Sequence, residues 1–338
     1  MKLRLGIVGC GDIATFTTLF AKLNRGIDVA ACCDISAERA AKFARRFRIP
    51  QQYTAYENML AQADLDAVYL AVPHHLHHPM LLQAIASDKP TFVEKPVTRT
   101  WAEGIEVARL SAENKVKIAV NYQYRYDKGC YALARAVQGG NLGAIESVHI
   151  NVPWSRQAGY FENAGWHTHI ATAGGGTLIT QGSHFLDIAL WALGEQPLNA
   201  IGSTLKRRFP DVEVEDTAHG EIETESGAVI VIDSTMAADK ERGVTIEVVG
   251  ERGSARYSNR PFPHVRFRGV RVRKARPPQR GIHALQRSIE GFRAWVVDDE
   301  PYLTPAHEAL PVLAAVEAVY KSAKTGQPAI IRTENNHA

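Results

Sequence analysis

The segment Gly9-Cys10-Gly11-Asp12-Ile13-Ala14 decides the fold of the first half of the chain. It follows an apolar run, Leu3–Val8, that predicts a β-strand, and it precedes a helical pattern at Ala14–Leu23. In a G-x-G-x-x-A segment, the first glycine permits a tight turn and the second lets the backbone approach a pyrophosphate, while the small last residue lets the helix pack closely on the sheet. The segment therefore predicts a dinucleotide site with the phosphates at the helix N-terminus.

The residue that ends the next predicted strand indicates which dinucleotide binds. Asp34 follows the strand Val29–Cys33. A carboxylate at this place accepts hydrogen bonds from the adenosine ribose hydroxyls and repels a 2′-phosphate. NAD is therefore favoured over NADP, although Arg39, a short way along the chain, keeps NADP open as an alternative.

Strands and helices continue to alternate up to about residue 122, which predicts a doubly wound parallel sheet, a Rossmann domain, over residues 1–122. The further strands are expected at Ala67–Val72, Thr91–Val93 and Lys117–Val120, and the helices at Ala37–Phe47, Tyr56–Ala63, Met80–Ser87 and Trp101–Asn114.

Beyond Asn121 most segments resemble strands, and glycines mark the turns between them, which predicts a mainly antiparallel sheet over residues 123–338. The strands are expected at Ile145–Val152, Ala200–Thr204, Ala218–Thr224, Ala228–Ser234, Thr245–Val249 and Ser254–Ser258. Helices are expected at Lys128–Gln138, Thr177–Leu193 and Pro305–Lys324. The last of these, over residues 305–324, is expected to pack back on the N-terminal domain. The fold class is thus α/β followed by α+β.

The composition excludes several classes of protein. A chain of 338 residues with 45% hydrophobic and 22% charged residues is ordinary for two globular domains. A net charge of +3 indicates neither nucleic-acid nor membrane binding, and no apolar run reaches the length of a membrane span. Cys10, Cys32, Cys33 and Cys130 lack zinc-ligand spacing, so reduced thiols and a cytoplasmic location are expected.

Lys95 is the first candidate catalytic residue. In a doubly wound sheet ligands bind where the parallel strands end, and Glu94-Lys95-Pro96 follows a predicted strand there. Pro96 disfavours a helical conformation at Lys95 and fixes the exit of the chain. A lysine held there can donate to a substrate oxygen and stabilise a developing alkoxide. The alternative is an exposed surface lysine.

His184 is the second candidate. The predicted helix Thr177–Leu193 places four polar residues within one arc, and that arc contains no Arg, Lys or Glu; they are Thr180, Ser183, His184 and Asp187. Such side chains suggest a wet pocket rather than a solvent face, and Gly174-Gly175-Gly176 before the helix permit close backbone approach. His184 is then a candidate general base. The alternative is a hydrogen-bonded core histidine without chemistry.

Taken together, these elements resemble the glucose–fructose oxidoreductase / inositol dehydrogenase / rhizopine catabolism (Gfo/Idh/MocA) family. The resemblance spans nearly the whole chain and rests on the G-x-G-x-x-A segment, Pro73 with His77, Glu94-Lys95-Pro96, Tyr122–Asp127, and Gly174–Gly176 leading to Gln181-x-x-His184-x-x-Asp187. It implies a Rossmann domain and a second domain with a large open sheet. It also implies Lys95 and His184 as the catalytic pair, a substrate between the domains, and homodimers or homotetramers that use the open sheet.

The resemblance also suggests the residues that line the site. The cofactor is expected to contact Gly9, Gly11, Asp12, Ile13, Ala14, Asp34, Arg39, Pro73, His74, His77, Glu94, Lys95, Gln123 and Arg125. The substrate is expected to contact Lys95, Tyr124, Arg156, Tyr160, Trp166, Thr180, His184 and Asp187. No metal site is expected, although His74, His75, His77 and His78 lie close together in the sequence.

Two positions depart from the family pattern. Thr180 stands where many members carry Asp or Asn, and His167 follows Trp166 where a related branch tends to carry Arg. That branch includes nucleotide-sugar 3-dehydrogenases, and its Trp-x-Arg-x-x-x-Tyr stretch is similar to Trp154–Tyr160. This likeness points toward oxidation of a sugar ring hydroxyl.

The chain is therefore expected to be an NAD-dependent dehydrogenase or reductase that acts on a secondary hydroxyl or ketone of a sugar, cyclitol or nucleotide sugar. His184 would remove the hydroxyl proton, Lys95 would stabilise the alkoxide, and Asp187 and Thr180 would orient the substrate or His184. One alternative is a redox-neutral enzyme that retains its NAD, and another is a non-catalytic ligand sensor. The basic segment from Arg266 to Arg280 is expected to be a solvated edge strand with a bulge at Gly269, or else a contact for phosphates.

Overall fold

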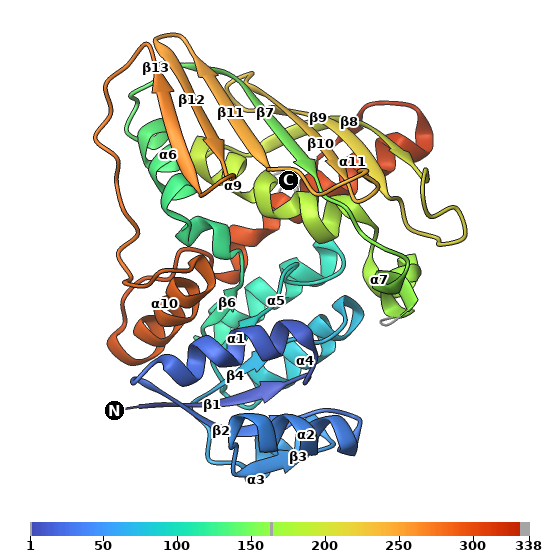
Figure 1. The fold of residues 1–338 in the computed structure, drawn as a ribbon, viewed down its shortest axis with the longest axis vertical. Coiled ribbons are helices and arrows are strands. Elements are labelled where there is room, and N and C mark those ends of the chain that lie inside the picture. Colours follow the sequence, from blue (N-terminus) through green and yellow to red (C-terminus); the bar gives the residue numbers. More distant parts are fainter. Residues whose placement is uncertain (1, 163–164, 332–338) are drawn as a thin grey trace. The chain divides into compact units, whose positions relative to one another are not determined.

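The structure, a computed structural model, describes residues 2–162 and 165–331, and these fall into two compact units (Figure 1). The first unit contains the chain up to Gln123 together with Gln279–Ala309. The second unit contains Tyr124–Pro278 and the chain from Leu310 onward. The division therefore differs from the expected one, because residues 279–309 belong with the N-terminal unit.

The described strands of the first unit form one six-stranded parallel sheet in the order β3-β2-β1-β4-β5-β6. This confirms the predicted doubly wound sheet. The strands are β1 (Leu3–Val8), β2 (Ile27–Cys33), β3 (Gln51–Tyr53), β4 (Ala67–Leu70), β5 (Thr91–Val93) and β6 (Ile118–Val120). The short β3, which was not expected from the sequence, is at the edge beside β2.

Five helices connect these strands: α1 (Asp12–Leu23), α2 (Ala37–Phe47), α3 (Tyr56–Gln62), α4 (His74–Ala86) and α5 (Trp101–Asn114). Ser36 caps α2 by accepting from the amide of Arg39, and Thr100 forms a capping box with Glu103 at the start of α5. The prediction began α4 after Pro79, because proline disfavours helix interiors. The helix instead starts directly after Pro73 and accommodates Pro79 in its first two turns.

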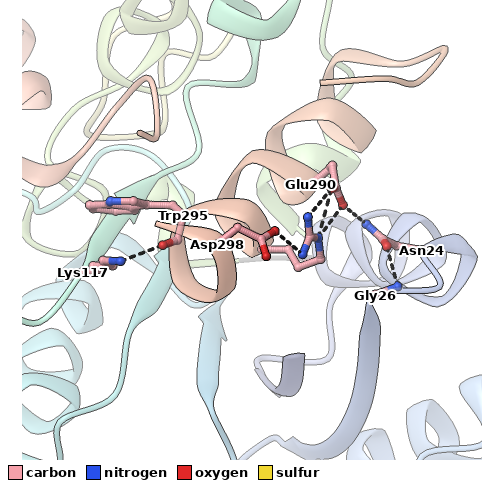
Figure 2. A network of polar contacts seen from close by, with 7 residues as sticks. Asn24, Gly26, Lys117, Glu290, Trp295 and Asp298 are labelled. Carbon is pink, nitrogen blue, oxygen red and sulfur yellow. Dashed lines mark hydrogen bonds and ion pairs between the residues drawn. The ribbon is translucent and has the colours of Figure 1, made fainter. Parts of the chain in front are cut away.

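The return segment, Gln279–Ala309, contributes helix α10 (Ala284–Asp298) and the short turn η4 (Ala306–Ala309) to the first unit. Figure 2 shows two contacts that hold α10 in the first unit: Asn24 donates to Glu290, and Lys117 donates to the carbonyl oxygen of Trp295. Within the helix, Glu290 also pairs with Arg293. Of the segment 305–324 that was expected to pack on the N-terminal domain, residues up to Ala309 lie in the first unit, where η4 contacts α5 and β6, and the helix from Leu310 belongs to the second unit.

The described strands of the second unit form an eight-stranded sheet in the order β13-β12-β11-β7-β10-β9-β8-β14. All neighbours are antiparallel except β7 and β10, which confirms the mainly antiparallel prediction. The strands are β7 (Ile145–Pro153), β8 (Pro197–Leu205), β9 (Thr217–Thr224), β10 (Val229–Thr235), β11 (Thr245–Gly250), β12 (Gly253–Ser258), β13 (His264–Arg268) and β14 (Ala329–Ile330).

One face of this sheet is apolar and is covered by helices, as Figure 1 shows. Alternate residues such as Val148, Ile150, Ile230 and Ile232 are buried on that face. The covering helices are α6 (Lys128–Gln138), α9 (Ser183–Leu193) and α11 (Leu310–Thr325), and α9 continues a π-helical turn, η3 (Leu178–Gly182). A smaller cluster contains α7 (Gly159–Glu162), η2 (Gly165–Thr168) and α8 (Ile170–Ala173).

The basic segment is only partly the edge strand that the sequence predicts. Val265 to Arg268 lie in β13, which pairs with β12. Gly269 adopts a φ of 77° and is not a bulge, because the following residues up to Pro278 form no strand. No helix in the described part of the chain is long and apolar enough to cross a membrane.

Candidate active site

The ends of the parallel strands line up at one edge of the first unit. Val8 of β1 is the register neighbour of Leu70 in β4, Leu70 of Val93 in β5, and Val93 of Val120 in β6. The segments that follow these strands therefore begin side by side. This register brings together the glycine loop, Pro73 with the start of α4, Glu94 with Lys95, and Asn121 with Gln123, as the sequence predicts.

The two glycines of the loop are constrained in different ways. Gly9 has a φ of 86°, and a Cβ there would lie 2.2 Å from the carbonyl oxygen of Ala71, so the position requires glycine. Among the described residues, a Cβ on Gly11 would meet nothing within 4 Å. Helix α1 begins at Asp12 without a side-chain cap in the described structure. The loop thus has open space beside the helix N-terminus, which suits a pyrophosphate.

The Asp34 carboxylate is held at the same edge by two backbone amides. Its Oδ2 accepts from Cys10 and its Oδ1 from Ser36, both at 2.9 Å. The carboxylate is therefore fixed against the glycine loop, and each oxygen keeps a second lone pair that can accept from a ribose hydroxyl. Arg39 lies on the exposed face of α2.

His77 joins two of the loops at this edge. Its Nδ1 lies 2.7 Å from the carbonyl oxygen of Pro96 and its Nε2 lies 3.0 Å from that of Val72. Burial lowers the pKa of His77 to about 4, so the ring is neutral and donates through one nitrogen. His74 packs beside it with the ring centroids 5.6 Å apart. His77 thus links the chain after β4 to the chain after β5, and its predicted contact with the cofactor stays a prediction.

The histidine cluster is dispersed in the structure. His78 lies 2.8 Å from a carboxylate oxygen of Glu106 in α5, whereas His77 faces backbone carbonyls. Within residues 2–162 and 165–331, no group of three or more His, Cys, Asp or Glu side chains could hold a metal ion.

In the second unit, Glu215 anchors the helix that carries His184. Its buried carboxylate accepts from the amides of Gly176 at 2.7 Å and Leu178 at 3.0 Å, and from the hydroxyl of Tyr320 at 2.9 Å. A Cβ on Gly176 would lie 1.8 Å from the carbonyl oxygen of Glu215, and one on Gly175 would lie 2.3 Å from Tyr320 Oη. The close approach of Glu215 and Tyr320 therefore requires glycine at both positions.

Thr180 and Ser183 turn their hydroxyl hydrogens to the backbone. Thr180 Oγ1 donates to the carbonyl oxygen of Gly176 and Ser183 Oγ to that of Ile179, each at 2.6 Å. Thr180 lies in η3, one turn before His184, and its side chain also hydrogen-bonds that of Tyr160. The predicted polar arc is thus largely buried, with only 8% of Thr180 and 6% of His184 exposed.

Arg125 and Asp187 bind each other. The guanidinium donates twice from Nε, at 2.9 and 3.2 Å, and once from Nη2, at 2.8 Å, to a carboxylate that is completely buried. The Arg125 guanidinium also lies 5.2 Å from the centroid of the Trp191 ring. The sequence assigned Arg125 to the cofactor and Asp187 to the substrate. Their geometry instead favours a positioning role, because the pair ties the chain at Arg125 to α9.

This ion pair fixes a ring next to His184. Tyr124, which precedes Arg125, meets His184 edge to face with centroids 5.2 Å apart, and lies 4.6 Å from the ring of Phe185. Trp154 reaches Phe185 from the end of β7, with centroids 6.0 Å apart. A continuous series of ring contacts therefore begins at His184.

The series of ring contacts continues to the guanidinium of Arg156. The Arg156 guanidinium lies 5.2 Å from the Trp154 ring and 5.6 Å from the Tyr160 ring, and Tyr160 stacks on His167 with centroids 4.3 Å apart. Trp166 contacts His167 in turn. Five of the predicted substrate residues are thus joined in one chain of contacts: Tyr124, Arg156, Tyr160, Trp166 and His184. Phe185, Trp154 and His167 were not predicted as site residues, since aromatic residues in strands and helices usually indicate core.

Two family models match the chain. One, described as an oxidoreductase family with an NAD-binding Rossmann fold, matches residues 3–122, and the other, the GFO/IDH/MocA C-terminal domain, matches residues 130–256. The 1,5-anhydro-D-fructose reductase of Ensifer adhaerens is 26% identical over 98% of this chain and 99% of its own. An inositol 2-dehydrogenase of Burkholderia cenocepacia is 28% identical over 97% of this chain and 89% of its own.

Solved structures match across nearly the whole chain as well. The WlbA dehydrogenase from Bordetella pertussis, in complex with NADH and UDP-GlcNAcA, has a TM-score of 0.85 and 25% identity over 99% of this chain and all (100%) of its own. The aldose-aldose oxidoreductase from Caulobacter crescentus has a TM-score of 0.86 and 21% identity over 98% of this chain and 100% of its own. This likeness shows a shared fold.

Proposed function

Because the chain belongs to the GFO/IDH/MocA family of NAD-binding oxidoreductases, we propose that it transfers a hydride between NAD and a secondary hydroxyl or ketone of a sugar, cyclitol or nucleotide sugar. The observation that carries this proposal is the alignment of the strand ends, which sets Lys95 at the same sheet edge as the glycine loop and Asp34. The reductase and the inositol dehydrogenase that resemble the chain act on molecules of this kind, as their names state.

The residues at the sheet edge fit NAD. The space beside Gly11 and the uncapped start of α1 suit a pyrophosphate, and the fixed Asp34 carboxylate suits ribose hydroxyls and disfavours a 2′-phosphate. Bound NAD would supply the hydride acceptor in oxidation and its reduced form the donor in reduction.

His184 would accept the proton of the substrate hydroxyl, and Lys95 would stabilise the negative charge that develops on its oxygen. His184 is a general base that accepts the substrate hydroxyl proton, since imidazole titrates near neutral pH. Lys95 donates to the same oxygen and stabilises the alkoxide as it forms. Tyr124, held by the neighbouring Arg125–Asp187 pair, restrains the His184 ring.

The substrate-facing residues favour a carbohydrate. The half-buried rings of Tyr124, Trp154 and Tyr160 offer apolar faces for the C–H side of a sugar ring, and the Arg156 guanidinium offers charge-assisted hydrogen bonds to a carboxylate or phosphate substituent.

The test is NADH formation with sugars, inositols, sugar acids and nucleotide sugars, comparing the wild type with Lys95→Ala and His184→Ala. The proposal predicts turnover with at least one substrate and its loss in both variants. Silence with every substrate, together with NAD that remains bound through purification, would instead favour the redox-neutral alternative.

We further propose that the enzyme forms a homo-oligomer through the open face of the second sheet. The outward-facing residues of β12 and β13 include Arg256, Arg266 and Arg268, and like charges face each other where Arg256 pairs with Arg266. The outward-facing residues of β9 and β10 include the acidic Glu221, Glu223 and Asp233. One end of the face is therefore complementary to the other.

This polarity selects one symmetry axis. In the order β12-β11-β7-β10-β9, a two-fold axis along β7 sets β12 of one copy opposite β9 of its partner, whereas an axis across the strands would set β12 on β12. Arg256→Glu and Glu221→Arg should each weaken the dimer, and the two together should restore it. Sedimentation at several concentrations checks this, and unchanged association in both single variants would overturn it.

We also propose a reducing, cytoplasmic location. All four cysteines are free, and Cys32, Cys33 and Cys130 are buried.

A further inference from the structure

A chain of six buried polar side chains crosses the first unit and has Glu94 near its centre. The Tyr69 hydroxyl donates to Glu94 Oε1 at 2.6 Å, and Asn121 Nδ2 donates to the same oxygen at 2.8 Å. Behind Tyr69, the hydroxyl of Thr17 in α1 lies 3.0 Å away. Because Tyr69 gives its hydrogen to Glu94, Thr17 is the donor in that contact.

The other half of the chain comes from the return segment. Ser288 in α10 donates to Asn121 Oδ1 at 2.9 Å, and the Tyr302 hydroxyl lies 2.8 Å from Ser288 Oγ. Since Ser288 gives its hydrogen to Asn121, the Tyr302 hydrogen is shared between Ser288 Oγ and the carbonyl oxygen of Val120, which lies 3.3 Å from Tyr302 Oη. This fixes the Asn121 amide with its nitrogen toward Glu94.

The hydrogens of Thr17, Tyr69, Asn121 and Ser288 therefore all point toward Glu94. The Tyr69 and Asn121 donors both reach Oε1, and hydrogen bonds to a carboxylate oxygen favour its charged form. Burial raises the pKa of Glu94, and the two donors and the neighbouring Lys95 act against that effect. The network thus offsets part of the cost of a negative charge inside the sheet.

Building on the proposed function, we propose that Glu94 is a positioning residue that keeps Lys95 protonated, and that α10 holds Glu94 in place through Ser288 and Asn121. Lys95 directly follows Glu94, is half-buried, and must carry its proton to stabilise an alkoxide. A fixed negative charge beside an ammonium group favours the charged form of both.

Helix α10 can position Glu94 because contacts with other parts of the first unit hold the helix in place. Asn24 donates to Glu290 and Lys117 donates to the carbonyl oxygen of Trp295, as Figure 2 shows, and these two contacts hold the helix and so fix the position of Ser288. The return segment is then part of the catalytic architecture, although none of its residues need touch the cofactor or the substrate.

The test measures the pKa of Lys95 without relying on activity. Competitive labelling of amines across a pH range, with the Lys95 peptide quantified by mass spectrometry, is carried out on the wild type, Glu94→Gln, Glu94→Asp and Ser288→Ala. Exposed Lys22 provides an internal standard. Tyr56→Phe is the matched control, since it removes a buried hydroxyl that has no hydrogen-bond partner among the described residues.

Glu94→Gln should lower the pKa of Lys95 by about one unit or more, and Glu94→Asp should restore most of it. Ser288→Ala should shift it the same way by less, because Glu94 loses its fixed place. The alkaline limb of kcat should move with the labelling result. A Lys95 pKa that is equal in the wild type, Glu94→Gln and Ser288→Ala would overturn the inference. A labelling shift in a protein that never forms NADH would support the inference while contradicting the proposed function.

Discussion

Breaking the buried ion pair of Arg125 and Asp187 should cost more stability than any exposed pair could. In Asp187→Asn the carboxylate charge is lost, while the Arg125 guanidinium, only 2% exposed, stays buried and loses the counter-charge of Asp187. Removing one partner of such a pair typically costs about 3–5 kcal/mol. Three short contacts of 2.8–3.2 Å and the ring of Trp191 leave the guanidinium little room to reach water. We therefore expect the loss to fall within that range.

Urea denaturation followed by tryptophan fluorescence measures this loss, because Trp191 stacks on Arg125 and reports on the second unit. Arg109→Met is the matched control, since Arg109 makes an exposed pair with Glu113 and should change stability by less than about 1 kcal/mol. Combining Arg125→Met with Asp187→Leu should recover most of the loss. A single Asp187→Asn variant as stable as the control, or a double variant less stable than it, would refute the reasoning.

Three further predictions concern the first unit. Gly9→Ala should destabilise the unit, because its Cβ would meet the carbonyl of Ala71, whereas Gly11→Ala should leave the melting temperature unchanged and weaken NAD binding alone, as calorimetry and titration can show. Burial lowers the pKa of His77 to about 4, so its contribution to the free energy of unfolding is complete above about pH 6.5 and is lost as the pH falls toward 4. In urea titrations over this pH range, the wild type should therefore lose up to about 3 kcal/mol more of its free energy of unfolding than His77→Gln does. Asp34→Ser should weaken NAD binding and strengthen NADP binding, and equal affinities before and after the change would contradict the role of the carboxylate.

The alternating half of the fold was predictable because its signals are local. Leu3–Val8 and the glycine loop specify a strand, a turn and a helix by their own sequence. The shared edge of the sheet follows from the rule that parallel strands end together. The sequence alone therefore places the segments at Pro73, Lys95 and Asn121 at one edge of the sheet.

Helix α10 could not be found in this way, because its buried face carries polar residues. Arg287, Ser288 and Gly291 lie on that face beside Ile289 and Phe292, so the apolar period is interrupted. What makes these polar residues stable inside is a set of partners far away in the sequence, such as Asn121 for Ser288.

The same limit applies to the second unit. Spacing identified Arg125 and Asp187 as notable residues but could not show that they bind each other across 62 positions of sequence. Glu215 gave no signal at all, since its function as the anchor of the His184 helix depends on Gly176 and Tyr320 reaching it from separate segments.

The central claim is that a hydride passes directly between a carbinol carbon and NAD, and isotope transfer tests it most directly. A substrate deuterated at the reacting carbon is incubated with the enzyme and NAD, and the NADH is examined by mass spectrometry. The account predicts NADH that carries the deuterium, at a rate that falls sharply in Lys95→Ala and His184→Ala. Product formation with the deuterium released into water, and none in NADH, would contradict it.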